Sequence, residues 1–202
     1  MTTATETTTS TWNIDPSHSA IEFAAKHLMI TTVKGRLADA SGTVVIDETN
    51  PANSSATVEF DAKSVDTRSV QRDEHLRSAD FLDVAHFPTI SFASRRVTGA
   101  SAQPGAEFTV VGDLTIHGVT KEVTLAATYE GRGRDPWGGE RVSFSADAKI
   151  DRREFGLVWN AALETGGVLV SNDIKSCPTR SSGGSARDGW RSRHSAGRRT
   201  AS

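Results

Sequence analysis

The sequence of 202 residues predicts an all-β fold in one domain. Three observations carry this prediction. Apolar and polar residues alternate along several segments, stretches rich in Gly, Pro, Asn and Ser separate those segments, and one segment alone has a helical composition. About seven or eight strands at this spacing are typical of a sandwich or a barrel.

The expected strands follow in chain order. In AIEFAAKHL, Ile21, Phe23 and Ala25 oppose polar neighbours, and in SATVEFDAKSV the residues Val58 and Phe60 do the same. Further strands are expected at residues 34–47, 89–98 and 141–150. Two alternating stretches at residues 108–116 and 123–129 are joined by HGVTK, and a connection this short predicts an antiparallel hairpin.

The helical exception lies within TRSVQRDEHLRSADFLDVAHFP, residues 67–88. Its residues are mostly good helix formers and fit no period of two, so we expect a helix at 68–82. Arg72 and Asp73 are adjacent and diverge by about 100° on a helix, so they do not form a dyad. We interpret Asp73 and His75 as residues that hold the helix on the barrel.

Charge and composition exclude several classes of protein. The last 27 residues carry six arginines and one acid, which leaves 17 basic and 24 acidic residues in 1–175. Nucleic acid is therefore not an expected partner. The single cysteine excludes an intrachain disulfide framework. No apolar run approaches a membrane span, and the first residues lack the pattern of a signal peptide, so we expect no stable membrane insertion and a cytoplasmic location.

Catalytic and metal-binding motifs are not found. The histidines at 18, 27, 75, 86, 117 and 194 lack the tight spacing that aims two imidazoles at one ion. No GxSxG occurs, and GRGRDPWGG lacks the features of a phosphate-binding loop, so it is interpreted as a hairpin turn. We expect no catalytic residues, no metal and no cofactor.

Small residues at inward positions raise the question of a hollow interior. Ala25, Ala62, Ala127, Ala146 and Ala148 are placed where larger side chains would fill a small barrel. An apolar void there is a ligand site. A core filled by the remaining aliphatic and aromatic side chains is the alternative, and the pattern alone leaves both open.

Four blocks of sequence closely resemble the YceI-like family of polyisoprenoid-binding proteins. They are DPSHSAIEFAAKHLMITTVKGRL, SVDTRSVQRDEHLRSADFLDVAHFPTISFAS, GDLTIHGVTKEVTL and RREFGLVWNAALETGGVLVSNDIK, in order over residues 11–175. The resemblance implies an extended, lipocalin-like, eight-stranded antiparallel β-barrel that encloses a tunnel for a prenyl chain, such as that of a polyprenyl quinone or polyprenyl phosphate. The implied role is carriage, storage or sensing of this lipid, without catalysis.

The chain departs from the family after VSNDIK, where SCPTRSSGGSARDGW replaces the expected closing strand. We therefore expect the last strand to be missing or altered, and residues 1–10 and 176–202 to be disordered. An edge left open is a template for pairing with a second copy, so a homodimer is an expected partner.

The predicted ligand site follows from this architecture. The apolar residues expected to line or abut the tunnel are Ile21, Phe23, Val58, Phe60, Phe92, Leu114, Ile116, Leu125, Phe144 and Phe155. Phe81 and Leu82 are expected on a helix that caps one side. His27, Arg68, Arg72 and His117 are the polar candidates at the mouth. Two alternatives stay open: an enzyme acting on a small amphipathic substrate, and a structural or partner-binding barrel with a filled core.

Overall fold

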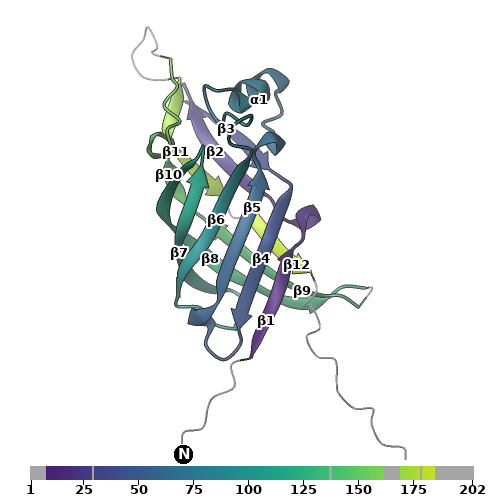
Figure 1. The fold of residues 1–202 in the computed structure, drawn as a ribbon. Coiled ribbons are helices and arrows are strands. Elements are labelled where there is room, and N and C mark those ends of the chain that lie inside the picture. The colour runs from purple at the N-terminus through teal and green to yellow at the C-terminus, as the bar shows by residue number, and fades with distance from the viewer. Residues whose placement is uncertain (1–7, 29, 137, 162–168, 178, 185–202) are drawn as a thin grey trace, which may run out of the picture.

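Eight antiparallel strands form a closed barrel in the order β1-β12-β9-β8-β7-β6-β5-β4 (Figure 1). The structure is a computed structural model that describes residues 8–28, 30–136, 138–161, 169–177 and 179–184. The barrel strands are β1 (Thr9–Ile14), β4 (Ala40–Asp47), β5 (Ser55–Asp61), β6 (Thr89–Thr98), β7 (Ala106–Ile116), β8 (Val119–Arg134), β9 (Glu140–Asp147) and β12 (Thr179–Gly184). The predicted fold class, an all-β antiparallel barrel of eight strands with one helix, is confirmed.

A second sheet of four strands adjoins the barrel, in the order β10-β11-β2-β3. Its strands are β2 (Ile21–His27), β3 (Thr31–Leu37), β10 (Lys149–Asp151) and β11 (Val170–Cys177). In Figure 1 this sheet lies at the end of the molecule that also carries the helix α1 (Val70–Arg77). Short 3-10 turns, η1 (Pro16–His18), η2 (Pro51–Asn53), η3 (Ala62–Ser64) and η4 (Arg152–Phe155), connect the strands.

The predicted hairpin is the pair β7 and β8, which run antiparallel in unbroken register from Ala106↔Tyr129 to Ile116↔Val119. His117 and Gly118 form its two-residue turn, and both have positive φ, 52° and 72°. This backbone twist matches the twist of the two strands, which is why a two-residue turn can join them. β8 extends to Arg134, so GRGR belongs to a strand and the turn expected there begins at Asp135.

The helix is shorter than predicted. It spans Val70–Arg77 instead of residues 68–82. At its start, Arg68 has φ 61°, a left-handed conformation that a helix interior does not contain. At its end, Ser78 is extended, and a series of turns follows, in which the Phe81 amide donates to the Ser78 carbonyl. Phe81 and Leu82 therefore lie after the helix and not on it.

Three other expected boundaries are corrected. The strand expected at 34–47 is two strands, β3 and β4, because Asp39 adopts φ 53° and breaks the extended backbone between them. The tail expected to be disordered from residue 176 contains the end of β11 and the whole of β12. Thr9 and Ser10, expected to be disordered, belong to β1. Residues 1–7 and 185–202 lie outside the described residues.

The apolar core has two parts along the barrel. The larger cluster includes Ile14, Phe60, Ile90, Ile116 and Phe155, all of them buried. The smaller cluster consists of Val97, Val110 and Ala127. Burial of such side chains is the main source of stability in a chain with one cysteine. No helix among the described residues is long and apolar enough to cross a membrane.

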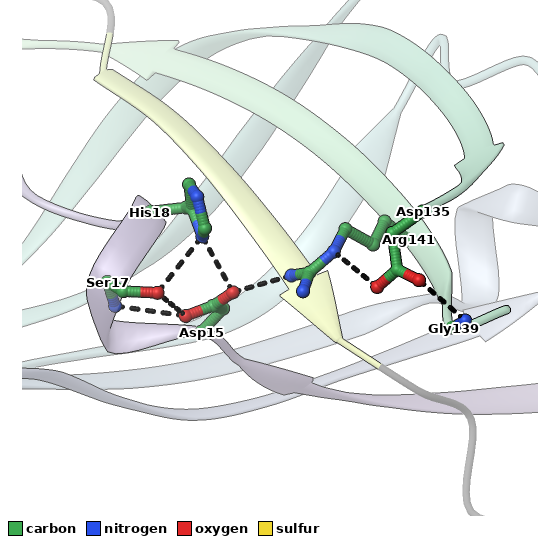
Figure 2. A network of polar contacts seen from close by, with 6 residues as sticks. All are labelled: Asp15, Ser17, His18, Asp135, Gly139 and Arg141. Carbon is green, nitrogen blue, oxygen red and sulfur yellow. Dashed lines mark hydrogen bonds and ion pairs between the residues drawn. The ribbon is translucent and has the colours of Figure 1, made fainter. Parts of the chain in front are cut away.

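An ion-pair network braces the two strands that flank β12. β12 pairs with β1 on one side and with β9 on the other. Figure 2 shows Arg141 of β9 donating to Asp15, which follows β1, at 2.5 Å, and to Asp135 at 3.2 Å. The Ser17 hydroxyl also donates to Asp15, and this bond, with those from His18 and Arg141, lowers the pKa of the Asp15 carboxyl. The network therefore links β1 to β9 independently of β12.

Candidate functional site

The barrel interior is the candidate site, because strand register places the predicted tunnel residues on its inner face. Val58 of β5 pairs with Phe92 of β6, and Phe92 pairs with Leu114 of β7, so the three side chains lie on one rung of adjacent strands. Gly112 makes room for the Phe92 ring, because a Cβ at that position would lie 2.6 Å from Phe92 Cζ. This rung spans the two core clusters, since Val58 and Leu114 pack against the larger one and Phe92 against the smaller.

A group of aromatic side chains lies on the neighbouring strands. The ring of Phe144 lies 5.4 Å from Tyr129 and 6.2 Å from Phe108. Leu125 lies on the same face of β8 as Tyr129, four residues away along the strand. The sequence prediction included Leu125 and Phe144 and missed Phe108 and Tyr129. The alternation in residues 106–129 assigns Phe108 and Tyr129 to the inner face, so the same pattern could have found them.

These inward side chains are half-buried, which distinguishes them from the sealed core. Val58, Phe92, Leu114, Leu125 and Phe144 all keep part of their surface exposed. A side chain that points into a ring of strands and still keeps exposed surface borders space that neighbouring atoms do not fill. The arrangement can bind an apolar chain, because such a surface gains free energy when hydrocarbon covers it.

Other predicted lining residues belong to the sealed core. Phe60, Ile116 and Phe155 are 9%, 8% and 1% exposed, and all three belong to the larger cluster. Phe81 is also buried, and its ring lies 5.2 Å from Trp159. These four side chains support the wall more than they border open space.

Two predicted lining residues lie on the second sheet. Ile21 and Phe23 of β2 are half-buried and pack against the larger core cluster. The Phe23 ring lies over Gly35 of β3, where a Cβ would approach within 2.5 Å of Phe23 Cζ. The second sheet thus extends the apolar wall beyond the barrel strands.

The four polar candidates do not form one cluster. Arg72 donates from Nε to Thr67 Oγ1 and from Nη2 to the Thr67 carbonyl, both at 2.7 Å. The His117 ring packs at 4.6 Å from Phe87. Arg68 is exposed, and His27 is the half-buried last residue of β2. Among the described residues, no hydrogen bond, ion pair or ring contact joins any two of these four.

Asp73 and His75 fix the helix to the chain segments that lie next to it. Buried Asp73 accepts from the Thr67 amide at 2.9 Å and from the Thr67 hydroxyl at 2.5 Å. His75 bonds Asp80 at 2.9 Å, and its ring lies 4.6 Å from Trp159. Arg72 and Asp73 do not pair directly, and both bind Thr67. These contacts support a structural role for this cluster.

A buried arginine orders the loop beside the helix. Arg152 is 3% exposed and donates to the carbonyls of Ser171, Leu157 and Trp159. Its Nη2 is buried and has no hydrogen-bond partner among the described residues. Desolvation lowers the pKa of this guanidinium. Sequence reasoning did not single out Arg152, because burial is a property of the fold.

An open hollow of about 390 Å³ lies next to β8 and β10, lined by the apolar Val123, Ile150 and Phe155 and by charged side chains. Its carboxylates include Asp151, bound by Arg153, and Asp173, bound by Lys149. The bonds from Arg153 lower the pKa of Asp151 to about 2. In the described part of the chain, no group of three or more His, Cys, Asp or Glu side chains is arranged to hold a metal ion. Two of the hollow's carboxylates, Asp151 and Asp173, therefore already have partners.

Comparison with known proteins agrees with this fold. The model of the YceI-like domain family matches residues 12–175. Protein YceI of Escherichia coli O157:H7 is 43% identical over 140 residues, which cover 69% of this chain and 71% of that protein. Protein YceI of Salmonella newport is 42% identical over the same shares.

Solved structures show the same fold. BcnA of Burkholderia cenocepacia superposes with a TM-score of 0.70 at 21% identity, covering 86% of this chain and 99% of that one. The YceI protein of Campylobacter jejuni gives 0.62 at 28% identity, covering 77% and 87%. A polyisoprenoid binding domain from Saccharophagus degradans, implicated in plant cell wall breakdown, gives 0.58 at 15% identity, covering 87% and 98%.

Proposed function

The chain belongs to the YceI-like family, and from this premise we propose that it binds the prenyl chain of a polyisoprenoid lipid in its barrel and carries, stores or senses that lipid without catalysis. The observation that carries the proposal is the set of inward, half-buried apolar side chains, Val58, Phe92, Leu114, Leu125 and Phe144. The ligand class is that of a polyprenyl quinone or a polyprenyl phosphate.

The physics of chain burial supports this ligand class. Each buried CH₂ contributes about 0.8 kcal/mol, so one isoprene unit contributes roughly 3 to 4 kcal/mol before costs. A few units outweigh the several kcal/mol lost on association. Affinity should therefore rise with the number of isoprene units, while a polar head group adds selectivity.

The first test is extraction of the purified protein with organic solvent, followed by mass spectrometry. A co-purified prenyl lipid is the expected result. The second test titrates the stripped protein with quinones of increasing tail length and measures fluorescence quenching. Affinity that rises with tail length supports the proposal, whereas lipid-free protein that also takes up no long-chain quinone rejects it in favour of a filled core.

A further inference from the structure

The hairpin of β2 and β3 carries positive charge on its outer face. Strand register places Lys34 of β3 on one rung with Ala24 of β2 and Lys175 of β11, and Lys26 lies on the same face of β2. All three lysines are exposed. Among the described residues, none of them forms an ion pair. The segment 23–38 contains no Asp or Glu, although residues 1–175 as a whole are acidic.

One acidic residue, Glu22, belongs to the hairpin and lies opposite Arg36 in register, and the acidic groups of β10 and β11 already have partners. Asp173 of β11 is bound by Lys149 at 2.7 Å, and Asp151 of β10 is bound by Arg153 at 2.5 Å. Both carboxylates border the open hollow on the β10 side of the sheet. The β2–β3 side of the sheet therefore presents a local excess of positive charge.

The tip of the same hairpin is apolar and exposed. Ile30 is 82% exposed and Leu28 is 40% exposed. Hydrogen bonds hold both residues in place: the Ile30 amide donates to the His27 carbonyl at 3.2 Å, and the Leu28 amide donates to the Leu169 carbonyl at 2.8 Å. Leu28 is thus held by the residue that precedes β11, and Ile30 by the turn after His27. Water-exposed apolar side chains at such a fixed position are a surface for contact with hydrocarbon.

We propose that this hairpin, with its apolar tip at Leu28 and Ile30 and its flanking Lys26 and Lys34, docks the protein on an anionic lipid bilayer. Stable contact with a bilayer needs both an apolar and an electrostatic contribution, and the hairpin supplies both. A second copy of this chain is disfavoured as the occupant, because a two-fold contact would place the lysines of one hairpin against those of the other.

The docking surface also gives the proposed lipid ligand a route. This part of the inference rests on the proposed function, since a polyisoprenoid resides in a bilayer and leaves it for water at a large cost per CH₂. β2 carries the exposed tip at one end and the half-buried Phe23, which belongs to the apolar wall, within the same strand. A prenyl chain that enters the protein at this end passes from the hydrocarbon of the bilayer to the apolar wall of the protein.

The test measures co-sedimentation of the full chain with vesicles of phosphatidylcholine alone and with about one quarter phosphatidylserine. Binding should appear with phosphatidylserine and disappear near 1 M salt, where the Debye length is about 3 Å. The pair K26Q/K34Q should weaken partitioning roughly tenfold or more, and K63Q/K121Q, which removes the same charge at exposed sites elsewhere, should not. I30N should weaken it, and V70N, at an apolar position on α1 that is 76% exposed, should not.

If K63Q/K121Q or V70N weakened vesicle binding as much as K26Q/K34Q or I30N does, the assignment to this hairpin would be overturned. Absence of binding to phosphatidylserine vesicles would overturn it too. Concentration-dependent self-association that I30N abolishes would identify a second copy as the occupant and overturn the proposal too. Quinone binding from detergent is measured on every variant. Failure of the unchanged chain to dock, with intact quinone binding, rejects this inference alone, and docking of the unchanged chain without quinone binding rejects the proposed function alone.

Discussion

Ala146 offers a direct test of whether the barrel interior is hollow. Ala146 lies on the inner face of β9, next to Ala127 in register, and it is half-buried against the smaller core cluster. Ala146→Phe adds a six-membered aromatic ring at that position. In a packed core such an insertion costs about 1 to 3 kcal/mol, because neighbouring side chains must leave their rotamers.

In a hollow barrel the outcome is different. The added ring covers apolar wall that is otherwise unfilled, so the free energy of unfolding should change by less than about 1 kcal/mol. The ring also takes the place of about one isoprene unit. Loss of roughly 3 kcal/mol of gross chain burial should weaken quinone binding by one to two powers of ten.

The assay combines urea unfolding with quinone titration. Ala126→Phe is the matched control, because Ala126 is the exposed neighbour of Ala127 on the outer face of β8. This control should leave quinone affinity unchanged. A loss of 1 kcal/mol or more in the stability of Ala146→Phe, with unchanged affinity, would show a filled interior and refute the reasoning.

Three further changes test the surrounding structure. Asp73→Ala leaves the Thr67 amide and hydroxyl without their acceptor and should lower the free energy of unfolding by about 3 kcal/mol in urea titration. Arg152→Lys cannot reach three carbonyls with one ammonium and should cost about 2 kcal/mol in the same assay. The folded pKa of Asp15 lies below its ordinary value of 3.8, so its bonds stabilise the fold above that pH and are lost as the pH falls further. Asp15→Asn should therefore flatten the loss of stability between about pH 5 and pH 2, measured by thermal unfolding.

The changes at Asp73 and Arg152 each have a control at the neighbouring residue. Glu74→Ala alters the exposed neighbour of Asp73, and Arg153→Lys alters the exposed neighbour of Arg152. Neither control should exceed about 0.5 kcal/mol. Asp15→Asn with an unchanged pH slope would show that the ion-pair network does not contribute to acid stability. Equal effects at positions 73 and 74 would contradict the structural role assigned to Asp73.

The inner wall could be predicted from the sequence because a strand alternates with a fixed period. Val58, Phe92 and Leu114 lie far apart in the sequence, yet each occupies an inward position of its own strand, and pairing places them on one rung. Alternation does not say how much of a side chain is covered. Phe60 and Phe92 follow the same pattern, and only the first is sealed in the core.

Helix and turn boundaries were less predictable because single backbone angles decide them. Arg68 and Asp39 adopt positive φ, and neither residue is a glycine whose presence would signal it. The convergence of Arg72 and Asp73 on Thr67 likewise depends on how the chain enters the helix. Residue types alone indicated a helix there, and tertiary contacts set its length.

The closing strand β12 could not be predicted from the alternation of side chains. Its sequence, TRSSGG, has no alternation, and for that reason a missing or altered strand was expected after VSNDIK. A closing strand must above all supply backbone N–H and C=O groups to both neighbours, and any sequence without proline can do so. Here the neighbours supply the apolar contacts, since Trp12 of β1 is 0% exposed and Val142 of β9 is 2% exposed. A polar strand can close this barrel because the strands on either side of it already bury their own side chains.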